Sequence, residues 1–337
     1  MKNKIMTIWV LIAVGISYII LASIYLVGCD ERPGTGIGWA EESDFEEIFE
    51  EESDLPNETP LLMSPPSVSK RSHRPPEGSA ARAFYDRLVY IMGNLRDTYY
   101  VHYSDKYMNE DDGIYKYDCS GFVSEFILKV ALPEHYNDLV QNAKRFHDAS
   151  SRRESPRAWG FYDYFNEILN GMAENKNNYW YVFKSFDNVR PGDIIVAKYD
   201  EEWRRKQIEK HGSASTGHVM VAWSFPVHSS CADNEYWIYV IDSSNSGHAK
   251  DTRRTEYDNV NDEKGIGKGQ MWFGIETKND KEGNKYEDPI FYRWSKSKCR
   301  KGCKYTLVTD ETNCTKNRER YERLEGIIMA RPIYSTQ

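Results

Sequence analysis

The sequence predicts an α+β protein. Apolar residues recur at helical spacing between residues 81 and 98 and again after Asp118. From residue 190 onward the chain instead contains short runs of branched and aromatic residues, separated by Gly, Asn, Asp and Ser, a pattern typical of antiparallel strands. Helices in the first part of the folded region, followed by strands in the second, indicate the α+β class.

Two helices and six strands are predicted between residues 81 and 333. The first helix, residues 81–98, places five apolar residues on one face: Phe84, Leu88, Ile91, Met92 and Leu95. The second begins at Asp118 and presents a face of Phe122, Val123, Phe126, Ile127 and Val130. Residues 133–175 are expected to mix helix and loop. The predicted strands are Ile194–Tyr199, Val219–Phe225, Tyr236–Ile241, Pro289–Trp294, Tyr305–Val308 and Ile327–Ile333.

The composition excludes several classes of protein. Of 337 residues, 40% are hydrophobic and 14% aromatic, so neither general disorder nor a collagen-like fibre fits. A mean hydropathy of -0.71 and a single long apolar run exclude a multi-span membrane protein. The net charge of -8 arises in residues 29–60, and the remaining chain has no basic excess that would indicate a nucleic-acid partner.

The N-terminus is predicted to be a targeting segment. Lys2 and Lys4 precede a run from Ile5 to Cys29 without a charged residue. Its end, Leu26-Val27-Gly28-Cys29, resembles the bacterial lipobox, which implies a signal peptide over residues 1–28 and lipidation of Cys29. An uncleaved anchor is the alternative, since a helix of this length can cross a bilayer core of ~30 Å. Both interpretations put the rest of the chain on the extracytoplasmic, periplasmic face of a bacterial membrane.

Residues 29–80 are predicted to be a disordered acidic tether. They are rich in Glu, Asp, Pro and Ser and have few periodic apolar positions. Such a segment cannot bury enough apolar surface to offset the entropy lost on ordering. The folded domain is therefore expected to occupy residues 81–337.

Cys119 is the candidate nucleophile because it lies at the predicted start of the second helix. Free amide groups and the positive end of the helix dipole favour a thiolate at this position. The same amides can stabilise an oxyanion during acyl transfer.

A nucleophilic cysteine needs a base within hydrogen-bond reach, and the base needs an orienting group. His218 opens one predicted strand and Asp242 ends the next. If the two strands form a hairpin centred on residue 230, His218 lies directly opposite Asp242 on the same face of the sheet. Asn245 and His248 lie close enough in sequence to replace Asp242 as the third group.

Four segments, taken in order, resemble the NlpC-type papain-like cell-wall cysteine peptidases. They are Asp118–Val123, Arg190–Ile195, Gly217–Val219 and Val240–Asp242. The resemblance covers roughly residues 85–245. It implies a papain-like fold, in which a nucleophile helix packs on a central antiparallel sheet, and hydrolysis of an amide bond in peptidoglycan stem peptides without a cofactor or metal.

The resemblance also implies roles for individual residues. Cys119 would be the nucleophile, His218 the general base and then the acid for the leaving amine, and Asp242 the orienting group. Tyr100 would line the oxyanion and substrate region, together with Asp118 and Ser120 beside the nucleophile.

The chain departs from the family's pattern in three places. The distance from Cys119 to His218 is 99 residues, longer than usual, so residues 133–185 are interpreted as an insertion. Asp242 stands where the family commonly has His. The chain after residue 245 has no family motif and is expected to cap the cleft or to form a subdomain.

Other conspicuous residues receive structural interpretations. Cys299, Cys303 and Cys314 are too few for a structural zinc without a nearby His, so a disulfide between two of them is favoured, with Cys231 as a candidate partner for the third. Gly265–Gln270 lacks the ending of a phosphate loop and is expected to be a substrate-facing loop. Five histidines are expected at the surface: His102, His135, His147, His211 and His228.

Together these features predict a membrane-anchored cysteine hydrolase that acts on peptidoglycan outside the cytoplasm. Two alternatives stay open. One is a thiol amidase or acyltransferase with a different substrate, and the other is a non-catalytic envelope lipoprotein. Oligomeric state is not predicted.

Overall fold

The computed structural model describes residues 74–146, 153–172, 178–228, 234–248, 250–253, 264–279, 283–293 and 324–334. All of them belong to the second of two compact units, which spans Glu51–Gln337. Five of the six cysteines lie outside the described residues: Cys29, Cys231, Cys299, Cys303 and Cys314. The predicted signal segment, most of the tether and the strand at 305–308 lie outside them as well. Within the ranges given above, no helix is long and apolar enough to cross a membrane.

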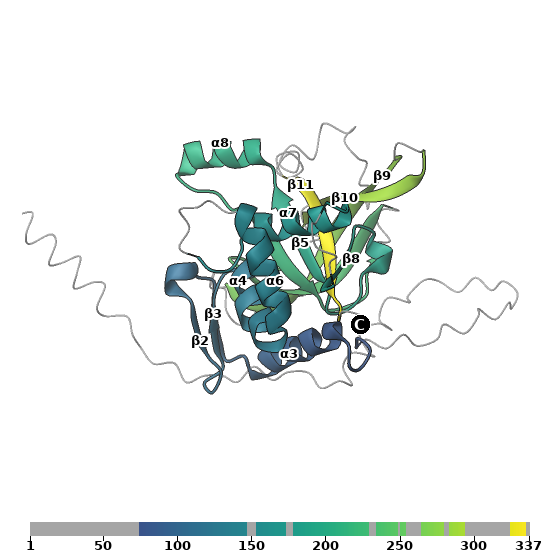
Figure 1. Cartoon of the computed structure of the whole chain (residues 1–337). Coiled ribbons are helices and arrows are strands. Elements are labelled where there is room, and N and C mark those ends of the chain that lie inside the picture. Colours follow the sequence, from purple (N-terminus) through teal and green to yellow (C-terminus); the bar gives the residue numbers. More distant parts are fainter. Residues whose placement is uncertain are drawn as a thin grey trace, which may run out of the picture. The chain divides into compact units, whose positions relative to one another are not determined.

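The architecture is mixed α/β and is built on a curled antiparallel sheet (Figure 1). Its strands are β4 (Trp180–Phe183), β5 (Ile194–Tyr199), β6 (Gly217–Ala222), β7 (Val227–His228), β8 (Glu235–Ser244), β9 (Gly265–Asn279), β10 (Lys285–Arg293) and β11 (Leu324–Pro332). The order is β10-β9-β8-β6-β5-β11-β4, with β7 paired to β8. The sheet curls far enough for β10 to contact β11 as well.

A second, three-stranded sheet precedes the main one in sequence. It contains β1 (Asp97–Tyr99), β2 (Tyr107–Asn109) and β3 (Ile114–Lys116) in the order β1-β3-β2. The Oγ1 atom of Thr98 accepts a hydrogen bond from the Ile266 amide at 2.8 Å and so ties this sheet to β9.

The helices lie beside the main sheet (Figure 1). They are α3 (Ala80–Asn94), α4 (Cys119–Gly121), η2 (Phe122–Leu128), α5 (Lys129–Ala131), α6 (Pro133–Ala143), α7 (Ala158–Leu169) and α8 (Glu201–His211), with single 3₁₀ turns η1 (Tyr103–Asp105), η3 (Lys144–Phe146) and η4 (Phe186–Asn188). α7 packs on β5 and β11, whereas α4 and η2 contact β6 and β8.

The first predicted helix is present as α3. Ser79 caps it by accepting a hydrogen bond from the Arg82 amide, and all five predicted face residues are buried. The helix ends at Asn94, earlier than predicted, because residues from Asp97 onward pair with β3 instead.

The second predicted helix is present as one continuous helical segment, Cys119–Ala131, here called the Cys119 helix. Its middle part, η2, is π-helical, and every residue of η2 is buried. Wider turns rotate later residues away from the face that regular helical spacing predicts. The prediction for Val130 is therefore wrong: its side chain is 49% exposed, and Leu128 is buried instead.

The strand predictions succeed where hydrophobic runs are long. β5 has the predicted bounds, and β6, β8, β10 and β11 overlap their predicted segments. The prediction of a loop at Gly265–Gln270 is wrong. This segment is the start of β9, a strand of fifteen residues. The polar helix α8 and the edge strand β4 were not predicted.

Residues after 245 do not form a separate cap or subdomain in the part that the structure describes. β9 pairs with β8, and β11 lies between β5 and β4 in the main sheet. These strands contribute Met271, Phe273 and Met329 to the same buried cluster as β5, β6 and β8. Within the described residues, this part of the chain extends the main sheet.

One of the five surface histidine predictions is also wrong. His135 is 2% exposed, and its Nε2 atom lies 2.9 Å from the carbonyl oxygen of Ile333. Its ring packs edge-on against Tyr179 and Trp180. His102, His211 and His228 are exposed as predicted, and His147 lies outside the described residues.

Candidate active site

The thiol of Cys119 is buried at the start of its helix. Asp118 is the N-cap residue, and its Oδ1 atom accepts a hydrogen bond from the Gly121 amide at 2.8 Å. Cys119 is 6% exposed and is a free thiol. Gly121 is needed here because a Cβ at this position would lie 2.2 Å from the Tyr117 ring. The cap and this close approach fix where the helix begins, as the sequence predicts.

His218 is delivered by the first residues of β6. It follows Gly217, which has φ +147 and would place a Cβ 2.0 Å from the Ala197 carbonyl oxygen, so only glycine fits. In β6, His218 lies on the same strand face as Met220, a member of the buried cluster. The imidazole therefore stands at the edge of that cluster, 6% exposed.

The structure brings His218 and Asp242 together. The Nε2 atom of the imidazole lies 2.5 Å from Oδ2 of the carboxylate. The predicted register is wrong by two residues, because Val221 lies opposite Ile241 and Ala222 opposite Val240. A two-residue shift preserves the face of each side chain, so the contact forms diagonally instead of directly across the strands.

His218 also interacts with the candidate nucleophile. It forms a side-chain hydrogen bond with Cys119 in addition to the one with Asp242. Burial lowers the pKa of His218, but the negative charges of Cys119 and Asp242 and the two hydrogen bonds outweigh it and raise the pKa to about 10. The site therefore favours the protonated imidazolium form of His218 beside the Asp242 carboxylate.

Asp242 is completely buried and is held by more than one group. The Nε2 atom of His248 lies 2.9 Å from Oδ2, and Nη2 of Arg253 donates to Oδ1 at 3.1 Å. Burial alone would raise the pKa of Asp242, but the nearby His248 and Arg253 charges and the histidine hydrogen bonds hold it well below its usual value. His248 thus lies beside Asp242 and does not replace it.

The glycines of β9 leave room for the side chains of His248 and Arg253. Gly267 lies opposite Asp242 in the sheet, and a Cβ there would come within 2.4 Å of the Arg253 side chain. A Cβ at Gly269 would lie 2.6 Å from the Cβ of His248. The glycine-rich motif therefore provides space for the segment that carries His248 and Arg253, a role that the sequence pattern did not reveal.

Arg153 is a site residue that the sequence analysis missed. Its guanidinium forms two hydrogen bonds with the Asp118 carboxylate, one of them at 2.5 Å, and donates to Ser120 Oγ at 2.9 Å. Burial raises the pKa of Asp118, but the charge and hydrogen bonds of Arg153 outweigh it and lower the pKa. No local motif marks Arg153, because it lies 35 residues from Asp118.

Tyrosines surround the same centre. Burial, followed by the nearby Cys119 and Asp118, raises the pKa of Tyr100. Tyr292 of β10 stacks parallel to His218 with ring centroids 6.5 Å apart, and its hydroxyl lies 2.5 Å from that of Tyr199. Tyr199 and Tyr292 belong to predicted strands but were not predicted to line the site.

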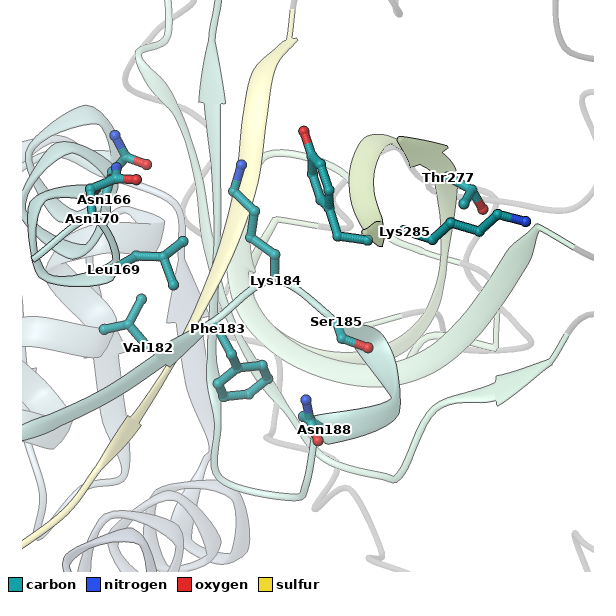
Figure 2. Close-up of a pocket in the computed structure, with 11 residues that line it drawn as sticks. Asn166, Leu169, Asn170, Val182, Phe183, Lys184, Ser185, Asn188, Thr277 and Lys285 are labelled. Atoms are coloured by element: carbon teal, nitrogen blue, oxygen red, sulfur yellow. Dashed lines mark hydrogen bonds between the residues drawn. The ribbon is translucent and has the colours of Figure 1, made fainter. Parts of the chain in front are cut away.

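A cavity of about 810 Å³ lies elsewhere in the domain. Asn166 of α7 and Asn170, which follows that helix, line one side, and Thr277 of β9 and Lys285 of β10 line the other side (Figure 2). Lys184, which follows β4, also lines the cavity. Its lining contains neither Cys119 nor His218 nor Asp242. We therefore do not place the thiol chemistry in this cavity.

Among the described residues, no group of His, Cys, Asp and Glu is arranged to hold a metal ion. Comparison with protein-family models, with curated proteins and with solved structures finds no match. The function proposed below is therefore inferred from the geometry of this site and from the sequence motifs.

Proposed function

We propose that this protein is a cysteine hydrolase of the papain-like, NlpC type, with Cys119 as nucleophile, His218 as base and acid, and Asp242 as the orienting group. The observation that carries the proposal is the continuous chain of contacts from the thiol to the imidazole and from the imidazole to a buried carboxylate. Both a helix N-terminus and a polarised His–Asp pair act on one sulfur atom, an arrangement suited to nucleophilic catalysis.

The reaction follows from these positions. The Cys119 thiolate attacks the amide carbonyl, and the developing oxyanion lies near the first amide groups of the helix, which have no intrahelical acceptor. The His218 imidazolium gives its proton to the leaving amine, and the acyl group stays on sulfur as a thioester. His218, now neutral, accepts a proton from water, which attacks the thioester and releases the acid.

The proposed substrate is the stem peptide of peptidoglycan, and the proposed location is the extracytoplasmic face of a bacterial membrane. Both follow from the sequence resemblance and from the expected lipid anchor at Cys29 with its acidic tether. No cofactor is required for the reaction as written, because the thiol and imidazole supply the nucleophile and the proton.

The test is hydrolysis of purified peptidoglycan by the full chain in mild detergent, followed by mass spectrometry of the released fragments. The matched control is Cys119→Ser, which is nearly the same size, so its melting temperature should stay close to that of the wild type. Release of fragments by the wild type, and none by Cys119→Ser, supports the proposal.

Two other outcomes overturn all or part of it. If peptidoglycan stays intact but iodoacetamide labels Cys119 at near-neutral pH, the chemistry survives and the substrate is another amide or ester. If peptidoglycan stays intact and Cys119 is unreactive, the protein is a non-catalytic envelope protein.

A further inference from the structure

Asp242 has no contact with solvent and lies against three basic side chains. His218 contacts Oδ2 from β6, while His248 and Arg253 approach from the segment that follows β8. Asp242 itself is 0% exposed. A buried carboxylate is tolerated only when it is paired and hydrogen-bonded, so these contacts decide both its charge and its orientation.

Arg253 is itself held in one position. Its Nε and Nη2 atoms donate to the two carboxylate oxygens of Asp251 at 2.8 and 2.6 Å, and its Nη1 atom donates to the Gly265 carbonyl at 2.9 Å. Asp251 in turn accepts the backbone amides of His248 and Arg253 at 2.5 and 2.8 Å. His248, Asp251 and Arg253, here called the Asp242 support, therefore form one hydrogen-bonded unit.

The Asp242 support and His218 both bind the Asp242 carboxylate. Arg253 binds Oδ1, His218 binds Oδ2, and His248 reaches both oxygens. Because Oδ1 is bound by a guanidinium that Asp251 and the Gly265 carbonyl also hold, Oδ2 is directed toward the imidazole. Without this contact, the carboxylate could rotate toward His248 or take up a proton, and either change would weaken its bond with His218.

We infer that Arg253, assisted by His248 and Asp251, is a positioning residue that keeps Asp242 ionised and directed at His218. This inference rests on the proposed function, since it assigns the support to the Cys119–His218 pair. The titratable and charged groups around Asp242 are His218 from β6, His248, Asp251 and Arg253 from the support, and, beyond His218, Cys119.

The test compares the pH dependence of Cys119 alkylation in Arg253→Ala and in the wild-type full chain. Iodoacetamide is the probe, and peptide mass spectrometry reports Cys119 separately from the other cysteines. Loss of a charge-assisted hydrogen bond to Asp242 should reduce alkylation at pH 6.5 by about tenfold or more. Guanidinium ion added to Arg253→Ala should restore part of the lost reactivity, whereas sodium at the same ionic strength should not.

Arg331→Ala is the matched control. Arg331 forms a similar two-point ion pair with the buried Asp193, at 2.8 Å for both contacts. Its hydrogen bonds within the described residues go to Asp193 and Asn188, and none goes to Cys119, His218 or Asp242. This substitution should lower the melting temperature while leaving the pH profile of Cys119 unchanged. His248→Gln, which keeps a side-chain N–H donor, provides a milder second variant if Arg253→Ala does not fold, and it should lower alkylation at pH 6.5 by a smaller factor.

An unchanged pH profile in folded Arg253→Ala, or in His248→Gln if only that variant folds, would overturn the inference. Alkylation does not require substrate, so this result is separate from the test of function. The two tests can also give different answers. If the wild type does not cut peptidoglycan but Arg253→Ala still reduces the reactivity of Cys119, the proposed substrate is refuted and the positioning role is retained.

Discussion

Gly267→Ala adds a methyl group on β9 next to the Arg253 side chain and so disturbs the Asp242 support. The new Cβ would lie 2.4 Å from Nε, 2.6 Å from Cγ and 2.8 Å from Cδ of Arg253, whereas ordinary contact begins at 3.4 Å. Arg253 must therefore move by about 1 Å, which disturbs its contact with Asp242, and overpacking of this kind costs about 1–3 kcal/mol. The φ of Gly267 lies outside the left-handed region, so alanine itself introduces no backbone strain.

The assay is thermal unfolding, with Cys119 alkylation measured in parallel. A loss of 1 kcal/mol lowers the melting temperature of a domain of this size by about 2–4 °C, so the expected decrease is roughly 2–12 °C. Gly93→Ala is the matched control, because Gly93 lies inside α3 and its added Cβ would meet nothing within 4 Å. That substitution should stabilise the protein by about 0.5–1 kcal/mol.

The reasoning would be refuted by a Gly267→Ala variant that is as stable as the wild type and alkylates Cys119 at the same rate. Such a result would mean that Arg253 does not lie against β9, and the proposed positioning role would lose its structural basis. A stability loss with unchanged alkylation would separate the packing role of Arg253 from its role toward Asp242.

Three further predictions concern charge and burial. Asp118→Ala removes both the helix cap and the partner of the buried Arg153, so the free energy of unfolding, measured with urea, should fall by about 3–5 kcal/mol; a loss under about 1 kcal/mol would contradict the assigned contacts. The pKa of His218 rises from 6.5 to about 10 on folding, so its stabilising contribution is complete below pH 6.5 and is lost as the pH rises through about 10. The stability difference between the wild type and His218→Gln should therefore shrink between pH 7 and 10.5, and a constant difference would contradict the raised pKa of His218. Burial lowers the pKa of His135, so its neutral form is favoured and stability is lost as the pH falls below 6.5. Between pH 7 and 5, the free energy of unfolding of His135→Phe should therefore fall less than that of the wild type. An equal fall in the two proteins, measured by denaturant titration at each pH, would refute this.

Local sequence signals predicted the parts of the site that depend on local structure. Cys119 follows a capping Asp at the start of a helical segment, and His218 and Asp242 each lie in a strand that is marked by a run of branched and aromatic residues. Their shared face was predictable because side chains alternate with period two. The register was not, since the amides of Trp223 and Ser224 both donate to the Tyr239 carbonyl, an irregularity that uniform hairpin counting ignores.

The residues that were missed depend on distant partners. Arg153 is recognisable only beside Asp118, and His135 is buried because the carbonyl that it contacts lies 198 residues away. β9 looked like a loop because Gly267 and Gly269 lower strand propensity, yet both glycines serve a close approach of side chains from another segment. The sequence contains these residues but not the contacts that explain them.

The central claim is that the Cys119 sulfur touches the His218 imidazole and owes its reactivity to it. Residue-resolved alkylation of Cys119 at pH 6.5, in the wild type and in His218→Ala, tests this contact most directly. We expect the wild-type thiol to react at least about tenfold faster, because the imidazolium stabilises the thiolate at this pH. Equal rates in the two proteins would show that the histidine does not act on the sulfur.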